Sequence, residues 1–221
     1  MIGAGGGHSV GTLVVLAALT LVPFALLMLT SFVKLSVVLS LARSALGTTA
    51  VPPTMVITGL AALLSVFVMA PTARRMWDAA EPALAGQNLD APSPAALLDA
   101  GQRARAPLKE FLIKHAHGRD RAVFVDMARR LDPARAGEIT DADLVVVMPA
   151  FVTSELKEAF QIGFLLFIPF LVIDLVVAAA LAAMGLTNLP PNQVALAFKL
   201  LLFVAVDGWI LLSRGLLLGY A

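Results

Sequence analysis

Hydrophobic residues fill most of this chain, in blocks long enough to cross a lipid bilayer. Four apolar segments lie at about residues 10–33, 54–73, 159–184 and 191–213. A transmembrane helix needs about 20 such residues. At a rise of about 1.5 Å per residue, the third segment would be about 39 Å long and the fourth about 34 Å. The pattern predicts an all-α, membrane-associated protein built from two hydrophobic helical hairpins.

Polar stretches between these blocks divide the chain into three parts. We predict an N-terminal hydrophobic hairpin over 1–73, a polar helical insert over 74–157 and a C-terminal hydrophobic hairpin over 158–221. The insert and its first following residue, 74–158, contain 12 of the 16 Lys and Arg and 13 of the 15 Asp and Glu. Only a few charged residues remain in the two hydrophobic parts.

The segment 34–53 is expected to be a connector between the first two apolar blocks. It carries Lys34 and Arg43 but no acidic residue, and it ends at the pair Pro52-Pro53. Short loops rich in Lys and Arg face the cytoplasm. With two crossings on either side, the insert and both termini are then expected on the opposite, periplasmic side.

Within the insert, proline and apolar spacing predict short helices. Asp90, Pro92, Ser93 and Pro94 form a linker that ends in a helix-start signal. A helix is predicted over 107–117, with Pro107 in its first turn and four spaced residues on one face: Leu108, Phe111, Leu112 and His115. A second amphipathic helix, AVFVDMARRL, is predicted to end at Asp132-Pro133, and the residues after it lead back towards the membrane.

Composition supports an apolar environment and excludes several kinds of chemistry. The chain is 59% hydrophobic and 14% charged, whereas soluble domains carry about 25% charged residues. The net charge of +1 gives no reason to expect nucleic acid as a partner. There is no cysteine, so neither a disulfide nor a thiolate site is possible. The first residues lack the basic region of a secretory signal, and we interpret them as leading into the first anchored segment.

Three charged residues interrupt the C-terminal apolar segments: Asp174, Lys199 and Asp207. If the two segments fold as a hairpin about Asn188, these residues lie about 21, 17 and 28 Å from the turn. Asp174 and Lys199 then meet at nearly the same depth and can form an ion pair within the hairpin or between subunits. Such a pair serves either a proton relay or, as we favour, the fixing of helix register.

Signals for an enzyme or a cofactor are missing from the sequence. GAGGG near the start follows no strand, so it is not a phosphate-binding loop. His115 and His117 lack a third ligand nearby in the sequence and are weak evidence for a metal. We therefore expect neither catalysis nor a cofactor or metal.

Pro169 is expected to kink its helix and to free the carbonyl of Leu165.

One stretch of the chain, residues 149–176, is more specific than composition. Its sequence PAFVTSELKEAFQIGFLLFIPFLVIDLV resembles the signature of the R subunit of the type III secretion export apparatus, called FliP in flagella. Residues 28–48 and 198–209 resemble two further blocks of that family. The signature positions carried over are Thr153, Ser154, Glu155, Phe160, Gln161, Gly163, Pro169 and Phe170.

The resemblance implies a core subunit of a protein-conducting export gate at the bacterial inner membrane. Five R subunits are expected to assemble with S and T subunits into a helical channel, largely on the periplasmic side, through which unfolded polypeptides pass. Other export-gate and basal-body proteins are further expected partners. In such an assembly, some of the four apolar segments would pack against other subunits rather than cross the bilayer.

The resemblance places the pore constriction in the loop 184–191, at Gly185, Leu186, Thr187 and Asn188. Family members commonly carry methionines directly after this glycine, and flexible thioethers suit a pliable seal. Here the methionines are replaced, so a soft apolar seal does not follow from the sequence. The missing methionines and the missing cleavable leader favour an injectisome over a flagellum. The alternatives are a small proton-coupled transporter that uses Asp174, Lys199 and Asp207, and a membrane scaffold without a conducting role.

Overall fold

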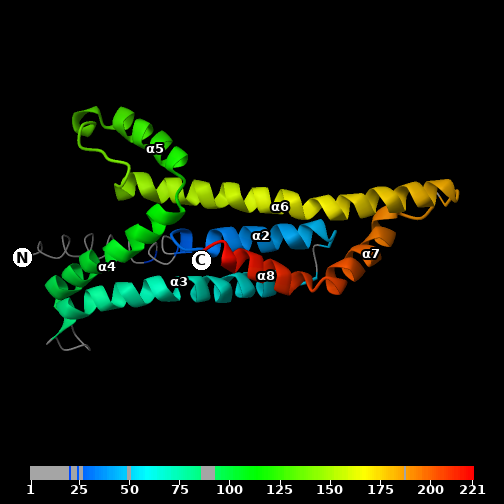
Figure 1. Cartoon of the computed structure of the whole chain (residues 1–221), viewed down its shortest axis with the longest axis horizontal. Coiled ribbons are helices and arrows are strands. Elements are labelled where there is room, and N and C mark those ends of the chain that lie inside the picture. The colour runs from blue at the N-terminus through cyan, green and yellow to red at the C-terminus, as the bar shows by residue number, and fades with distance from the viewer. Residues whose placement is uncertain (1–19, 21–23, 25–26, 49–50, 86–92, 187) are drawn as a thin grey trace, which may run out of the picture.

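The structure is a computed structural model that describes residues 20, 24, 27–48, 51–85, 93–186 and 188–221. All regular structure in this described part is helical, which confirms the predicted all-α class (Figure 1). The helices are α2 (Phe32–Ala45), α3 (Thr54–Leu84), α4 (Pro94–His115), α5 (Gly118–Leu131), α6 (Leu144–Ala183), α7 (Pro191–Ala205) and α8 (Gly208–Leu218), with one 3₁₀ turn at Pro133–Arg135.

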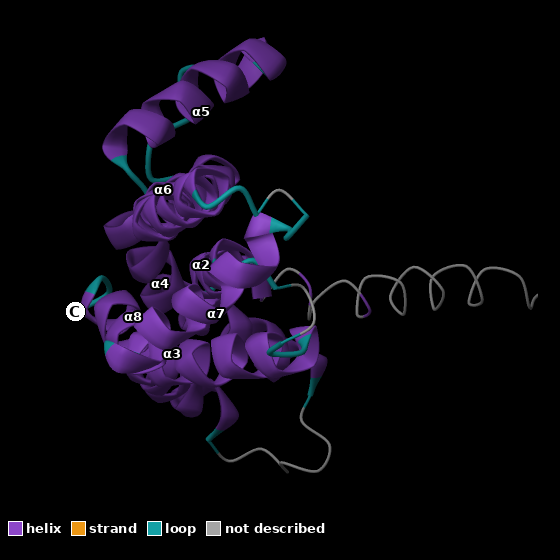
Figure 2. Ribbon diagram, turned by 90° about the vertical axis from the view of Figure 1, so that its right-hand side faces the viewer, coloured by secondary structure: helices purple, strands orange, loops and turns teal. Residues whose placement is uncertain are grey.

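Helix α6 forms the long axis of the molecule. Its 40 residues correspond to a length of about 60 Å. α2 lies beside it, α3 and α8 lie on the far side of α2, and α7 returns from one end of α6 (Figures 1 and 2). Pro149 and Pro169 both lie inside α6, and the helix continues through each of them as one element. The kink expected at Pro169 therefore does not end the helix.

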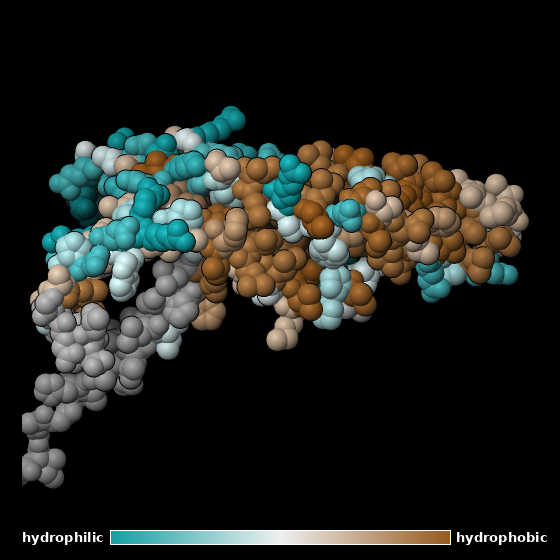
Figure 3. Space-filling model, turned by 60° about the horizontal axis from the view of Figure 1, so that its bottom comes forward, coloured by the Kyte–Doolittle hydropathy of each residue, from teal (hydrophilic) through white to brown (hydrophobic). Residues whose placement is uncertain are grey.

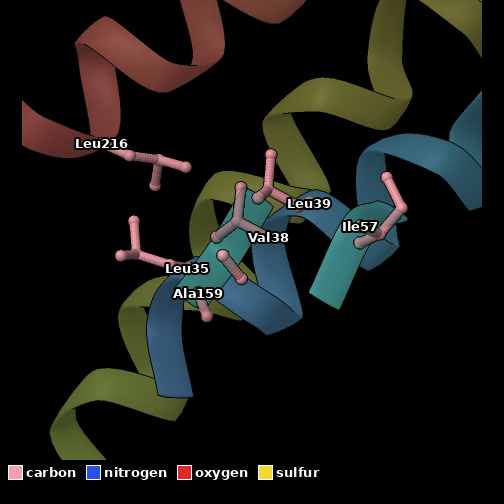
Figure 4. Close-up of a cluster of buried hydrophobic side chains, with 7 residues drawn as sticks. Leu35, Val38, Leu39, Ile57, Ala159 and Leu216 are labelled. Atoms are coloured by element: carbon pink, nitrogen blue, oxygen red, sulfur yellow. The ribbon is translucent and has the colours of Figure 1, made fainter. Parts of the chain in front are cut away.

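The segment expected to be a connector, 34–53, is mostly helix α2, and this prediction is wrong. Its apolar residues recur at helical spacing, so α2 buries a face between α3 and α6. Figure 4 shows the resulting core, in which Leu35, Val38 and Leu39 meet Ile57 of α3, Ala159 of α6 and Leu216 of α8. Lys34 and Arg43, the two cations that suggested a cytoplasmic loop, thus belong to the most buried helix of the described chain.

The polar insert contains the helices that the sequence predicts, with one boundary in error. Ser93 is the N-cap of α4, and its side chain accepts a hydrogen bond from the backbone N–H of Ala96. α4 therefore begins at Pro94, and Pro107 lies inside the helix rather than in its first turn. The earlier turns form because Ala96 and Ala100 are buried, α4 packing along α3. α5 ends at Leu131 with Asp132 as its C-cap, at the Asp132-Pro133 break that the sequence predicts.

The number of expected membrane spans also changes. α3 and α6 are each long and apolar enough to cross a membrane, while α7 and α8 qualify only as a pair bent by 60°. The predicted single helix over 191–213 is thus broken, at Asp207, whose backbone has a φ of 51°. The next residue is Gly208, where a Cβ atom would lie 2.4 Å from the ring of Phe203. The first predicted span, 10–33, falls mostly outside the described residues.

Gly163 sets the closest approach of α2 to α6. A Cβ atom at this position would lie 2.3 Å from Cδ1 and 3.3 Å from Cβ of Leu41. We expect Gly163→Ala to lower the free energy of unfolding by about 1–3 kcal/mol, because the extra carbon overpacks this contact. The measurement is denaturation of the detergent-solubilised chain. Gly59→Ala is the control, because a Cβ there meets no atom within 4 Å; equal effects of the two substitutions would contradict the prediction.

Candidate functional site

The α6–α7 hairpin brings Asp174 and Lys199 together, as the sequence predicted. Lys199 Nζ lies 2.7 Å from Asp174 Oδ2, and the lysine side chain is only 8% exposed. Its ammonium group also lies 3.7 Å from the position that a Cβ of Gly47 would occupy, just beyond the last turn of α2. The carbonyl end of a helix carries partial negative charge and stabilises a nearby cation. The pair therefore joins α6, α7 and the end of α2.

Asp207 does not take part in this pair. It lies exposed in the break between α7 and α8, and its carboxylate forms no ion pair with any residue that the structure describes. Of the three charged residues singled out in the apolar segments, only two therefore meet. A proton relay needs a continuous series of groups, whereas a pair that links three helices suits a structural role.

The loop after α6 has the turn chemistry that its sequence predicts. Gly185 adopts a φ of 70°. Its N–H donates to the carbonyl of Ala182 at 3.1 Å, and that of Leu186 donates to Leu181 at 3.0 Å. This is a Schellman motif, which requires a left-handed residue after the helix. Pro190 and Pro191 then begin α7.

The same loop presents apolar side chains at the tip of the hairpin. Met184 is 62% exposed, Leu186 43% and Leu189 45%. Asn188 is also exposed, and Thr187 lies outside the described residues. The tip therefore carries exposed apolar groups even though no methionine directly follows Gly185.

A buried charge cluster, which sequence reasoning missed, lies where α2 and α6 meet the residues after α8. Lys34 and Glu155 are 2% and 0% exposed. Lys34 Nζ lies 3.2 Å from Glu155 Oε1 and 2.7 Å from Glu158 Oε2. The sequence suggested only a loop cation at Lys34, because no local pattern links this residue to a carboxylate 121 positions away.

Tyr220, which follows α8, completes this cluster. Its hydroxyl donates a hydrogen bond to Glu155 Oε2, and its ring lies 4.0 Å from Lys34 Nζ in a cation–π contact. Burial and the nearby glutamates raise the pKa of Tyr220, so the hydroxyl keeps its proton. The ring also contacts Phe111 and His115 of α4. Burial, Lys114 and Lys34 lower the pKa of His115 to about 4, so the imidazole is neutral at neutral pH.

A second layer of hydrogen bonds ties α5 to the same cluster. Ser154 accepts a hydrogen bond from the backbone N–H of His117 at 2.9 Å and donates one to Asp120 at 2.7 Å. The hydrogen bond from Ser154, together with nearby Lys157 and His117, lowers the pKa of Asp120. His117 Nε2 lies 2.7 Å from Glu158 Oε1. No group of three or more potential metal ligands occurs among the residues described.

The eight signature residues of α6 divide into a buried half and an exposed half. Four of them are buried and hold the helices together, namely Ser154, Glu155, Gly163 and Phe170. The other four are exposed: Thr153, Phe160, Gln161 and Pro169. The buried half is explained by contacts within this chain. The exposed half has no such explanation and is available to other molecules.

Much of the apolar surface of the described chain is uncovered. Figure 3 shows polar side chains at the end that holds α4 and α5, and apolar ones over the opposite end. In the most apolar 18-residue stretch of α3, only 17% is buried, and the same holds for α6. Phe164 and Leu175 of α6 are 69% and 72% exposed. Exposed apolar surface of this extent marks contact with a membrane or with other subunits. The fold therefore defines an all-helical, membrane-associated subunit.

Comparison with known proteins identifies the family. Residues 15–216 match the model of the FliP family. The chain is 49% identical over 209 residues to the pathogenicity-related ORF2 of Xanthomonas campestris pv. glycines, covering 94% of this chain and 95% of that protein. It is 47% identical over 214 residues to the hypersensitivity response secretion protein HrcR of Ralstonia nicotianae, covering 95% and 96%. The flagellar biosynthetic protein FliP of Pectobacterium carotovorum subsp. carotovorum is 46% identical over 211 residues, covering 94% and 77%.

The chain belongs to the FliP family, which confirms the resemblance drawn from the sequence.

The buried cluster yields a prediction about stability. We expect Lys34→Met to lower the free energy of unfolding by about 3–5 kcal/mol, because it leaves the carboxylate of Glu155 buried without its cation. Combining it with Glu155→Leu should recover part of this loss, since the uncompensated charge is then gone. The measurement is denaturation in detergent.

Arg103→Met is the matched control for this substitution. Arg103 forms an ion pair with Asp99 in which both side chains are about half exposed, and such pairs contribute about 0–1 kcal/mol. A double variant as unstable as the sum of its two single variants would contradict the prediction.

Proposed function

We propose that this chain is a core, non-enzymatic subunit of the export gate of a type III secretion system. It forms a homopentamer that joins S and T subunits in a protein-conducting channel at the bacterial inner membrane, largely on the periplasmic side. Unfolded secreted polypeptides pass through this channel. Family membership carries the proposal, and the extent of exposed apolar surface on α3 and α6 supports it.

The proposed pore constriction is the tip of the α6–α7 hairpin, at Gly185, Leu186, Thr187 and Asn188. Three exposed apolar side chains at this tip, those of Met184, Leu186 and Leu189, support a seal by hydrophobic contact. Copies of the loop around a central axis would bring these side chains together. Leucine and one displaced methionine then replace the methionine run of other family members.

We further propose that the machine is an injectisome rather than a flagellum. The relatives from Xanthomonas and Ralstonia carry names that refer to pathogenicity and the hypersensitivity response. A third relative, the Yop proteins translocation protein R of Yersinia pestis, is 42% identical over 215 residues, 96% of each chain. Because identity to flagellar FliP is nearly as high, at 46%, overall identity does not separate the two machines. The loop 184–191, in which no methionine directly follows Gly185, supports the injectisome.

A small proton-coupled transporter is the alternative function. It would use Asp174, Lys199 and Asp207 as a path for protons. The separation of Asp207 from the ion pair of the other two residues counts against this function. A membrane scaffold without a conducting role is a third candidate. The ion permeability of a variant with an altered loop at the hairpin tip distinguishes it from a channel.

Secretion assays on charge variants distinguish a channel subunit from a transporter. We expect Asp174→Asn and Lys199→Ala to reduce assembly with the S and T subunits and secretion in parallel, because the pair joins α6, α7 and the end of α2. The measurements are co-purification of the three subunits and the amount of secreted protein. Asp207→Asn is the control and should leave both unchanged. Normal assembly of Asp174→Asn with abolished secretion would favour proton conduction and contradict the structural role.

Substitution of the loop tests the proposed constriction. Replacing Leu186, Thr187 and Asn188 by glycine should make the assembled complex permeable to small solutes, because the apolar contact at the tip is lost. The measurement is ion permeability of cells or vesicles that contain the assembled gate. Replacing exposed Leu131 of α5, at the polar end, by glycine is the control. Unchanged permeability of an assembled loop variant would contradict the placement of the seal and would favour the scaffold.

A further inference from the structure

A cavity of about 420 Å³ lies between α3 and α4, at the polar end of the apolar surface. α3 lines it with residues that include Pro71 and Arg75, and α4 with residues that include Phe111 and Lys114. The ring of Tyr220 also lines it. Pockets of about 300–1,000 Å³ bind small ligands. This cavity is separate from the hairpin tip and from the Asp174–Lys199 pair.

The charge around this cavity is suited to an anion. Arg75 pairs with Glu110 at 2.8 Å, and both side chains are more than half exposed. Lys114 forms no ion pair with any residue of the described chain. Arginine carries five N–H donors, so Arg75 can bind a second anion while it contacts Glu110. Arg75, Lys114 and Glu110 together give the cavity a net positive charge. Lys114 also contributes to the lowered pKa of neighbouring His115.

A ridge of side chains on α3 connects the cavity with the exposed apolar surface. Leu63, Phe67, Pro71 and Arg75 follow one another at intervals of four residues, so they lie along one side of the helix. Leu63 and Phe67 are 71% and 70% exposed. From Leu63 to Arg75 the ridge is about 18 Å long. This length is close to half of a hydrocarbon core of about 30 Å, which is one leaflet.

The cationic end of this ridge has the composition of a membrane interface. The apolar run of α3 ends at Arg74 and Arg75, and Trp77 follows with 62% of its surface exposed. Exposed tryptophan gathers at the level of lipid headgroups, and basic residues there contact anionic lipids. A ridge that is apolar over the length of one leaflet and ends at Arg75, in a cavity that Lys114 also lines, has the length and charge expected for contact with one anionic lipid molecule.

We propose that the α3–α4 cavity binds the phosphate headgroup of an anionic phospholipid, with one acyl chain along Leu63 and Phe67. Arg75 binds the phosphate through its planar fork and Lys114 acts as a point charge. The rings of Phe111 and Tyr220 form the cavity wall beneath the headgroup. The proposal rests on the proposed function as an inner-membrane export-gate subunit whose exposed α3 surface contacts lipid. It deepens that function by assigning a ligand to the end of this surface that carries Arg75.

Native mass spectrometry of the purified full chain tests this site without any need for export or for the S and T subunits. The chain is reconstituted in nanodiscs of phosphatidylcholine that contain phosphatidylglycerol, and retained lipids are counted after release. We expect preferential retention of phosphatidylglycerol by the native chain. Arg75→Gln combined with Lys114→Gln should reduce this retention at least tenfold, because both charged contacts to the phosphate are lost; a tenfold change corresponds to about 1.4 kcal/mol.

Two further variants make the result specific. Arg103→Gln removes a cation from the same helix α4, outside the cavity, and should retain phosphatidylglycerol at the native level. Lys114→Gln alone should give an intermediate loss, and it keeps the Arg75–Glu110 pair in case the double variant fails to fold. Folding of every variant is checked by circular dichroism.

Four results would overturn the proposal. The first is native retention that does not distinguish the two lipids, and the second is loss that is equal in the Arg103 control. The third is full displacement of the lipid by millimolar inorganic phosphate, which would indicate a site for a soluble anion. The fourth is native-level retention of phosphatidylglycerol by the folded Arg75→Gln/Lys114→Gln variant. Failure of secretion alone would bear on the export function and not on this site.

Discussion

The buried pairing of Lys34 with Glu155 is the interaction on which the rest of this structure depends. Two charges in the interior are tolerated only when they face each other and when their remaining hydrogen-bonding capacity is satisfied. Here Glu158 and the Tyr220 ring supply further contacts to the lysine, and the Tyr220 hydroxyl supplies one to Glu155. These requirements bring α2, α6 and the residues after α8 to one point. The apolar core in Figure 4 lies beside this point and includes residues of α2 and α6, together with Ile57 of α3 and Leu216 of α8.

The two ends of α2 are held in related ways. At its start, Lys34 belongs to α2 and meets carboxylates of α6. At its end, Lys199 comes from α7 and lies between Asp174 and the last turn of α2. Glu155 and Asp174 are 19 residues apart on α6, or about 28 Å. The helix between them presents apolar residues outward, which leaves a long surface free for lipid or for other subunits.

These internal contacts explain why a chain with so much exposed apolar surface still has a defined shape. Hydrophobic burial is non-directional, and most of it is left to other molecules here. Charged and hydrogen-bonded groups have fixed geometry, and they determine which helices meet. The signature residues of α6 divide in the same way. The buried half packs within this chain, and the exposed half is available for contact with other molecules.

The sequence by itself determined the helical class, the apolar character of α3 and α6 and the turn at Gly185, because these follow from local periodicity and local turn chemistry. It also placed Asp174 opposite Lys199, since a hairpin with a short loop fixes depth along both helices. It could not place Lys34 beside Glu155, because that contact joins residues 121 positions apart. Nor could it show that 34–53 is mostly a core helix or that α7 and α8 are bent apart. An apolar run has the same composition whether lipid, another subunit or its own chain covers it, so only the tertiary structure decided which face is buried.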